Sequence, residues 1–139
     1  RTKDTARFLN VGMSLVEKHR IGNEDRVEVV SLIGDVENKT ALIVDDELGT
    51  GGTVIATAQA LKKHGARDIY CAVTHPVLSG EASNLLENSD VIETVVTDTL
   101  PVPDEKQGSK LTVLSIAPML GEAIHRIHGG LSVGAMFES

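Results

Sequence analysis

The chain has 139 residues, of which 41% are hydrophobic but only 2% aromatic, and its formal net charge is -7. This length suits one domain with a single core, and a core of Val, Ile, Leu and Ala suits a buried parallel sheet covered by helices. The negative charge repels a nucleic-acid backbone, and the few aromatic residues offer no platform on which bases could stack. Nucleic acid is therefore not an expected partner.

Cysteine content and hydropathy exclude further classes of protein. The lone cysteine, Cys71, lies in an apolar run at residues 69–73, so neither a disulfide framework nor a zinc cluster can be assembled around it. We predict that Cys71 is a small buried hydrophobe. No apolar stretch approaches the ~20 residues needed to span a bilayer, and nothing resembles a signal peptide. We expect a soluble, cytoplasmic protein that does not bind membranes.

The chain opens without methionine, in a polar stretch at residues 1–4 that is typical of the middle or end of a helix. We therefore expect it to be part of a longer protein. The segments that follow alternate short apolar runs with helical patterns, which predicts an α/β fold with a mainly parallel open sheet and flanking helices. Strands are predicted, in chain order, at residues 13–17, 27–32, 40–45, 68–73, 91–97 and 111–115.

The connections between these strands are of several kinds. Residues 18–25 are charged and predicted to be flexible, and residues 34–39 form a turn. The strand at residues 40–45 is a continuous apolar run that ends in two carboxylates, the pattern of a central strand whose carboxyl end meets solvent. Pro101, Pro103 and the polar run at residues 104–109 are expected to form an exposed loop.

Helices are predicted at residues 53–64, at residues 80–87 and from Pro118 to the glycine pair at 129–130. The first has apolar residues spaced to form one helix face, and Gly65 follows it as a C-terminal cap. Its apolar face consists of Val54, Ala58 and Leu61. The apolar face of the last helix consists of Leu120, Ala123, Ile124 and Ile127.

The loop at residues 46–52 is the place where ligands are expected, because open parallel sheets bind ligands beyond the carboxyl ends of their strands. Thr50, Gly51, Gly52 and Thr53 lie at a helix start. Glycine lets the backbone approach a ligand closely, helix-start N–H groups favour an anion, and the hydroxyls add donors. This composition indicates a phosphate site.

Two adjacent carboxylates, Asp45 and Asp46, precede the phosphate site and would repel a phosphate. Carboxylates accept hydrogen bonds from vicinal hydroxyls, at ~1.5–3 kcal/mol per charge-assisted bond, so the pattern favours a sugar phosphate. Divalent cations nearby would ease the repulsion. A structural role is the alternative, since Gly-Thr-rich turns are common and Asp often caps a helix. Residues 50–53 alone do not decide between the two, and the adjacent acids favour the sugar phosphate.

Residues 44–53 resemble the phosphoribosyl pyrophosphate binding motif of phosphoribosyltransferases and ribose-phosphate pyrophosphokinases. The flanking segments resemble the C-terminal half of ribose-phosphate pyrophosphokinases; they are residues 27–36, 74–80, 96–101, 115–128 and 132–137. This resemblance covers essentially the whole chain. It implies a type I phosphoribosyltransferase-like fold, Rossmann-like and three-layered, with residues 1–139 forming one domain of a longer two-domain protein.

The resemblance also implies an activity. The complete family enzyme transfers the β,γ-diphosphoryl group of ATP to the C1 hydroxyl of ribose 5-phosphate, with Mg²⁺, giving phosphoribosyl pyrophosphate and AMP. Most of the adenine pocket and the main Mg²⁺ ligands are expected in the absent N-terminal half. We therefore expect this chain alone to bind ribose 5-phosphate weakly and to make no product. The expected ribose 5-phosphate residues are Asp45, Asp46, Gly49, Thr50, Gly51, Gly52 and Thr53.

Lys18 and Arg20 match the outer positions of the family's Lys-Arg-Arg segment, which opens a mobile catalytic loop. Their expected role is to neutralise the diphosphoryl oxygens in the transition state. Without the resemblance, such cations are usually a solvated surface. His19 departs from the middle Arg, and Gly49 stands where many members have Asp. Both departures bear on catalytic competence.

Other residues match outlying parts of the family pattern. Ser132 and Phe137 match a tail that resembles the family's regulatory site, where inorganic phosphate and ADP act; in isolation Phe137 would pass as a core residue. His75 is expected to be a structural or domain-contact residue rather than a base. The family forms symmetric assemblies, often hexamers, so we expect a homo-oligomer.

Three other functions fit parts of the sequence. A phosphoribosyltransferase would share the binding motif but not the C-terminal match. A non-catalytic regulatory subunit or binding module of the same fold would explain Gly49 and His19, but not the retention of the cations and the phosphate site. A generic nucleotide-binding domain is disfavoured because the loop has neither G-x-G-x-x-G nor a phosphate-loop lysine.

Overall fold

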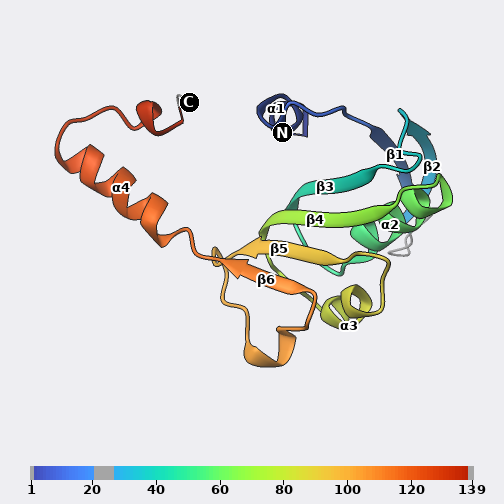
Figure 1. Ribbon diagram of the computed structural model, residues 1–139. Coiled ribbons are helices and arrows are strands. Elements are labelled where there is room, and N and C mark those ends of the chain that lie inside the picture. Colours follow the sequence, from blue (N-terminus) through green and yellow to red (C-terminus); the bar gives the residue numbers. More distant parts are fainter. Residues whose placement is uncertain (1, 21–26, 138–139) are drawn as a thin grey trace.

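The computed structural model describes residues 2–20 and 27–137, and for residues 18–20 and 27–30 it describes the backbone alone. Figure 1 shows the elements in chain order. They are α1 (Thr2–Leu9), β1 (Leu15–Arg20), β2 (Val27–Ile33), β3 (Thr40–Glu47), α2 (Gly52–Lys63), β4 (Asp68–His75), α3 (Ala82–Glu87), β5 (Glu93–Thr97), the 3-10 helix η1 (Asp104–Lys106), β6 (Leu111–Leu114), α4 (Ala117–His128) and the 3-10 helix η2 (Gly134–Met136).

The main sheet is parallel, with strand order β3-β4-β5-β6, so each strand lies beside the next one along the chain. Helix α2 packs on β3 and β4 and also contacts β2 and α3. Residues along β4 alternate between half-buried and buried, so the face of β4 that carries Ile69, Cys71 and Val73 is buried. The predicted α/β fold with a mainly parallel sheet and flanking helices is confirmed.

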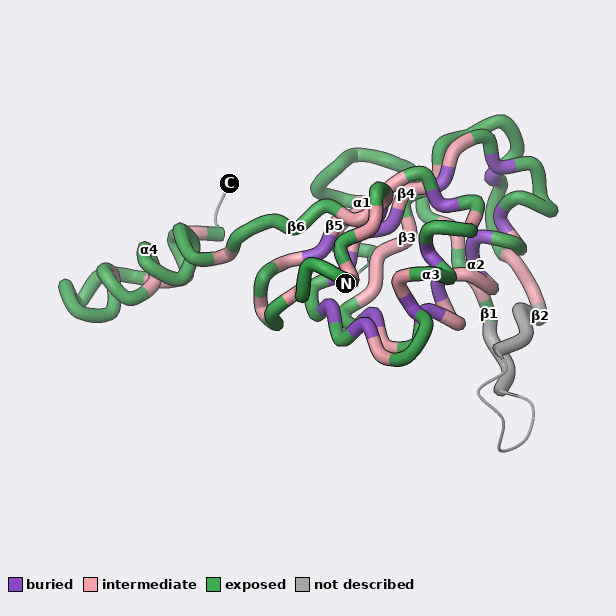
Figure 2. The backbone as a smooth tube through the Cα atoms, turned by 90° about the horizontal axis from the view of Figure 1, so that it is seen from below, coloured by how far each residue is buried: buried purple, intermediate pink, exposed green. Residues whose placement is uncertain are grey.

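The core lies between that buried face and the helices, and Figure 2 shows the buried residues concentrated there. The predicted inner face of α2 is confirmed, since Val54, Ala58 and Leu61 are all buried. Gly65 follows α2 with φ +84° and its N–H donates to the Lys62 carbonyl, as a C-terminal cap does. Cys71 is buried as predicted, with 1% exposure.

Strands β1 and β2 form a separate antiparallel pair. The prediction placed the first strand at residues 13–17 and a flexible segment from Lys18 onward. That boundary is wrong, because β1 runs to Arg20 and its last residues pair with Val27, Glu28 and Val29. Charge at a strand end does not prevent ladder bonds with a β-branched partner. Residues 21–26, the rest of the predicted catalytic loop, lie outside the described residues.

Strand β3 is not the central strand that the sequence predicted. Within the described chain it pairs with β4 alone and forms one edge of the main sheet. Ala41 and Ile43 pack against the core, while Leu42 on the other face is 44% exposed. An apolar run reports burial of a strand's faces, but carries no information about which strands lie beside it.

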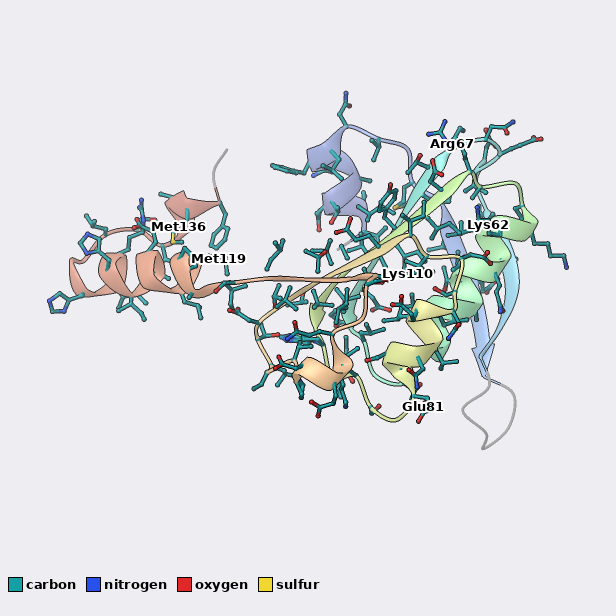
Figure 3. All side chains as sticks on the ribbon, turned by 60° about the horizontal axis from the view of Figure 1, so that its bottom comes forward. Lys62, Arg67, Glu81, Lys110, Met119 and Met136 are labelled. Atoms are coloured by element: carbon teal, nitrogen blue, oxygen red, sulfur yellow. The ribbon has the colours of Figure 1, made fainter. Side chains whose placement is uncertain are left out.

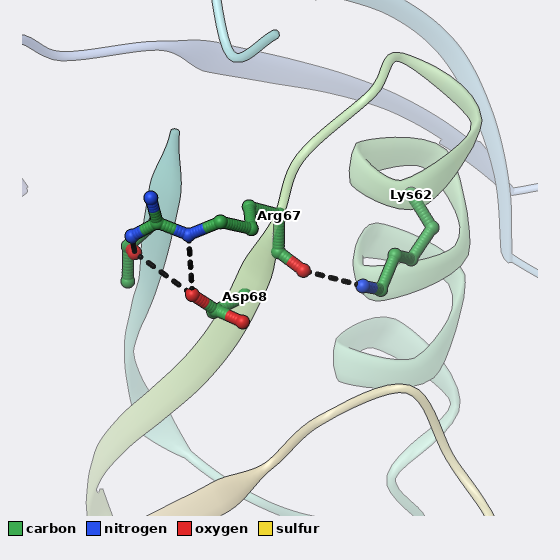
Figure 4. A network of polar contacts seen from close by, with 4 residues as sticks. Lys62, Arg67 and Asp68 are labelled. Atoms are coloured by element: carbon green, nitrogen blue, oxygen red, sulfur yellow. Dashed lines mark hydrogen bonds and ion pairs between the residues drawn. The ribbon is translucent and has the colours of Figure 1, made fainter. Parts of the chain in front are cut away.

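A polar network joins the amino ends of β3 and β4 to the end of α2 (Figure 4). The Arg67 guanidinium donates to Asp68 Oδ2 at 2.7 Å and to Thr40 Oγ1 at 2.8 Å. Lys62 Nζ donates to the Arg67 carbonyl at 2.6 Å. Hydrogen bonding to Arg67 holds the pKa of Asp68 below its usual value. This network joins β3 and β4 at their amino ends, opposite to the carboxyl ends where a ligand is expected.

Helix α4 extends beyond the carboxyl end of β6 and away from α2 and α3 (Figures 1 and 3). The predicted apolar side is present, but α4 buries no residue: Leu120, Ile124 and Ile127 are 48%, 67% and 69% exposed. The opening segment is helical as expected and forms α1, which also buries no residue. Over the described ranges, no helix has the length and apolarity needed to cross a membrane.

Candidate functional site

A hollow of about 290 Å³ lies at the carboxyl end of β3 and the start of α2. It is the position at which an open parallel sheet is expected to bind a ligand. The lining residues are Asp45, Glu47, Leu48, Gly49, Thr50, Gly51, Thr53 and Val54. Five of the predicted ribose 5-phosphate residues are therefore gathered around one hollow.

The two acidic side chains that line the hollow are Asp45 and Glu47 rather than the predicted pair Asp45 and Asp46. Strand β3 continues through Glu47, and successive side chains of a strand point to opposite faces, so residues 45 and 47 share a face. The backbone N–H of Asp46 donates to Asp45 Oδ1 at 2.9 Å. Sequence reasoning missed Glu47 because the predicted strand ended at Asp45; the two-residue period was the signal for it.

The start of α2 supplies groups that can bind an anion. Gly51 precedes the helix with φ +84°, a conformation that favours glycine, and the first helical bond runs from Ile55 N–H to the Gly51 carbonyl at 3.0 Å. The N–H groups of residues 52–54 come before that bond and have no partner within the helix. Together with the helix dipole and the Thr50 and Thr53 hydroxyls, they could bind an anion.

The backbone of residues 48–51, here called the binding loop, is supported by residues 75–79, here called the backing segment. Leu48 N–H donates to the His75 carbonyl at 2.9 Å, and Leu78 N–H donates to the Leu48 carbonyl at 2.8 Å. Ser79 N–H donates to the Gly49 carbonyl at 3.1 Å. Leu48 and Leu78 are each 1% exposed. The binding loop is thus held from behind by the connection that follows β4.

Polar side chains join β4 and β5 at their carboxyl ends. His75 Nδ1 lies 3.0 Å from Thr99 Oγ1, and the Thr97 and Thr99 hydroxyls both donate to the Thr74 carbonyl. These contacts agree with the structural role expected for His75. Hydrogen bonds from the Ser115 side chain and the Ile116 N–H hold the pKa of Asp98 below its usual value.

Four predicted residues come from segments other than the binding loop. Lys18 and Arg20 belong to β1 by their backbone, and their side chains lie outside the described part of the chain. Ser132 lies between α4 and η2, where its carbonyl accepts a bond from Arg126 at 3.1 Å. Phe137 follows η2 and is 68% exposed, so it is not a core residue.

No group of three or more His, Cys, Asp or Glu side chains is placed to hold a metal ion among the described residues. Asp45 and Glu47 nevertheless put two carboxylates on one hollow. Mg²⁺ commonly binds through one or two carboxylates together with waters and substrate phosphates. The arrangement can therefore accept hydroxyl donors or a hydrated cation at the strand and an anion at the helix start.

Comparison with known proteins identifies the family. A family model described as the phosphoribosyl synthetase-associated domain matches residues 14–138, nearly the whole chain. The chain belongs to this family. The match includes β1, the binding loop and α4, so the hollow and the predicted cation positions all lie within the family's own domain.

Individual relatives of the family carry a consistent name. The chain is 41% identical over 138 residues to a ribose-phosphate pyrophosphokinase of Oceanobacillus iheyensis, covering 99% of this chain and 43% of the relative. It is 44% identical over 137 residues to one of Caldanaerobacter subterraneus, with the same two coverages. The crystal structure of phosphoribosylpyrophosphate synthetase from Mycobacterium smegmatis matches with a TM-score of 0.80 and 34% identity, over 94% of this chain and 42% of that one. The chain thus spans less than half the length of these relatives.

Proposed function

We propose that this chain supplies the ribose 5-phosphate site of a ribose-phosphate pyrophosphokinase. The observation that carries the proposal is the hollow, in which two carboxylates on one strand face lie beside the N–H groups of a helix start. A sugar phosphate has the matching groups, vicinal hydroxyls at one end and a phosphate at the other. The names of the relatives support the same substrate class.

Each end of the hollow has a proposed role. Asp45 and Glu47 accept hydrogen bonds from the ribose hydroxyls, directly or through a hydrated Mg²⁺, and Asp46 shapes the strand end through its backbone bond to Asp45. The Thr50 and Thr53 hydroxyls and the backbone N–H groups from Gly51 onward bind the 5-phosphate. Gly49 and Gly52 leave room for the phosphate to approach the backbone.

The rest of the reaction needs residues beyond this site. We propose that the chain is the C-terminal half of a two-domain enzyme; the relatives themselves support only that it spans less than half of such a protein. The C1 hydroxyl oxygen attacks the β-phosphorus of ATP, the bond from that phosphorus to the α,β-bridging oxygen breaks, AMP leaves, and the hydroxyl proton is released. Lys18 and Arg20 neutralise the charge on the transferred group, and Mg²⁺, when bound, offsets charge on the phosphates.

Regulation and assembly complete the proposal. Ser132 and Phe137 belong to a site for inorganic phosphate and ADP at the end of the chain, well separated along the sequence from the hollow. Homo-oligomeric assembly and a cytoplasmic location stay predictions.

The first test is isothermal titration calorimetry with ribose 5-phosphate and Mg²⁺. We expect Asp45→Asn and Glu47→Gln, which keep side-chain size but remove charge, to raise Kd by about 10- to 100-fold, the loss of one charge-assisted hydrogen bond. Asp90→Asn is the matched control, because Asp90 lies in the turn before β5, at the amino ends of the parallel strands and so away from the hollow. The chain alone, given ATP, ribose 5-phosphate and Mg²⁺, should make no phosphoribosyl pyrophosphate.

Three outcomes would contradict the proposal. Equal affinity of all three variants for ribose 5-phosphate would show that the hollow is not the sugar site. Base-dependent release of pyrophosphate from phosphoribosyl pyrophosphate would indicate a phosphoribosyltransferase. Binding of ribose 5-phosphate without any synthesis by the complete protein would indicate a non-catalytic regulatory module.

A further inference from the structure

Lys106 makes a hydrogen bond that has no direct part in binding a sugar phosphate. It lies in η1, in the connection between β5 and β6, and is half-buried. Its Nζ donates to the backbone carbonyl of Leu78 at 2.5 Å. An ammonium group on a neutral carbonyl is a charge-assisted hydrogen bond, stronger than the ordinary bonds of a loop.

The carbonyl that Lys106 contacts belongs to a constrained residue of the backing segment. Leu78 has φ +47°, which branched and bulky residues rarely adopt, and its side chain is buried with 1% exposure. A residue in this conformation persists only where its surroundings hold it there. The Leu78 N–H donates to the Leu48 carbonyl and its own carbonyl accepts from Lys106, so both of its backbone polar groups are fixed.

The same residue connects Lys106 to the binding loop. Leu78 and Ser79 donate to the carbonyls of Leu48 and Gly49, the first two residues of the binding loop, which also line the hollow. Release of the Leu78 carbonyl would free Leu78 to relax from its left-handed conformation. The two donors that orient Leu48 and Gly49 would move with it.

We infer that Lys106 is a positioning residue, which fixes the binding loop from outside the hollow by holding Leu78 in its left-handed conformation. This inference rests on the proposed function for its ligand, ribose 5-phosphate, but the contact itself acts on the loop whether or not a ligand is bound. Lys106 is not among the residues that line the hollow, so its effect on affinity is indirect.

Lys110 offers a matched control. It is also half-buried, and its Nζ also donates to a backbone carbonyl, that of Ser89 at 2.7 Å. Ser89 lies in the turn between α3 and β5, and Lys110 precedes β6 (Figure 3), so this second contact does not reach the binding loop. Lys106→Met and Lys110→Met each remove one ammonium group and keep the aliphatic stem.

The experiment uses the complete protein as its gene encodes it and has two readouts. Amide hydrogen exchange without ligand should become faster in the binding loop of Lys106→Met but not of Lys110→Met. The KM for ribose 5-phosphate should rise about tenfold in Lys106→Met, with KM for ATP changed by less than about twofold. Lys106→Arg, which keeps a cationic donor, should restore most of the affinity.

Two results would overturn the inference: unchanged loop exchange in Lys106→Met, or equal effects of Lys106→Met and Lys110→Met on loop exchange and on KM. If Lys106→Met does not fold, Lys106→Gln takes its place, since a shorter neutral chain also leaves the Leu78 carbonyl without its charged donor. A wild-type protein without affinity for ribose 5-phosphate would contradict the proposed function, while the exchange comparison would still decide the role of Lys106.

Discussion

Gly51, in the binding loop, has a left-handed backbone conformation. Its φ of +84° costs an L-residue about 1–2 kcal/mol, while an added Cβ would meet Ala82 only at ordinary contact distance, 3.6 Å. We expect Gly51→Ala to lower the free energy of unfolding by about 1–2 kcal/mol, measured by urea denaturation. Gly49→Ala is the control, because Gly49 lacks a left-handed φ and its Cβ would meet only Glu47 Oε1, at 3.6 Å. Equal losses in both variants would contradict this account.

Single residues of the site were predictable to different degrees. The sequence predicted the glycines and threonines of residues 50–53, because a helix start binds anions. It also predicted Asp45, because ligands bind at the carboxyl ends of parallel strands. It did not predict Glu47 or Leu78. Glu47 lines the hollow only because β3 continues two residues beyond the apolar run that predicted it. The role of Leu78 depends on hydrogen bonds between segments far apart in the sequence.

At the scale of elements, Asp98 joins the end of β5 to the segment that begins α4. Its carboxylate accepts from the Ile116 N–H at 2.8 Å, and hydrogen bonds from Ser115 and Ile116 hold its pKa below the ordinary value of 3.8. A carboxylate whose pKa is lowered by folding stabilises the folded protein fully at pH values above its pKa in the unfolded chain. That contribution is lost as the pH falls through its pKa in the folded protein. The junction should therefore persist at pH 5 and release below pH 3.8.

The measurement is an NMR pH titration of the Ile116 amide. We expect its chemical shift to change with a midpoint below 3.8, and we expect no such transition in Asp98→Asn. A midpoint at or above 3.8 would show that the carboxylate gains nothing from Ser115 and Ile116 in solution.

Local patterns predicted elements better than they predicted the pairing of elements. Helix α2 was predicted to within one residue at each end, because its apolar spacing and Gly65 are local signals. The edge position of β3 depends on which strands lie beside it, and no local pattern contains that information. The antiparallel pair of β1 and β2 joins strands that are neighbours in the sequence, and it was not predicted because the residues from Lys18 onward were assigned to a flexible segment.

At the scale of the whole molecule, α4 stands apart from the core (Figure 2), and Leu120, Ile124 and Ile127 on its apolar side are exposed. We expect Ile124→Ser and Ile127→Ser in this chain to change the free energy of unfolding by less than about 0.5 kcal/mol each, as surface substitutions do. Ile69→Ala, at a site with 0% exposure, should cost about 2–5 kcal/mol.

Urea denaturation of the three variants measures both effects. If the α4 variants lost as much stability as Ile69→Ala, the helix would have to be covered in solution.

The consecutive order of the main sheet also determines how the chain can fold. Each strand from β4 onward pairs with the strand made just before it, so no later segment has to insert between two strands already in place. Every pairing closes a single connection, which is residues 48–67, 76–92 or 98–110, and the entropy of closing a connection grows only slowly with its length. Contact order is thereby low for a parallel sheet, and the strands can be added one at a time as the ribosome releases them.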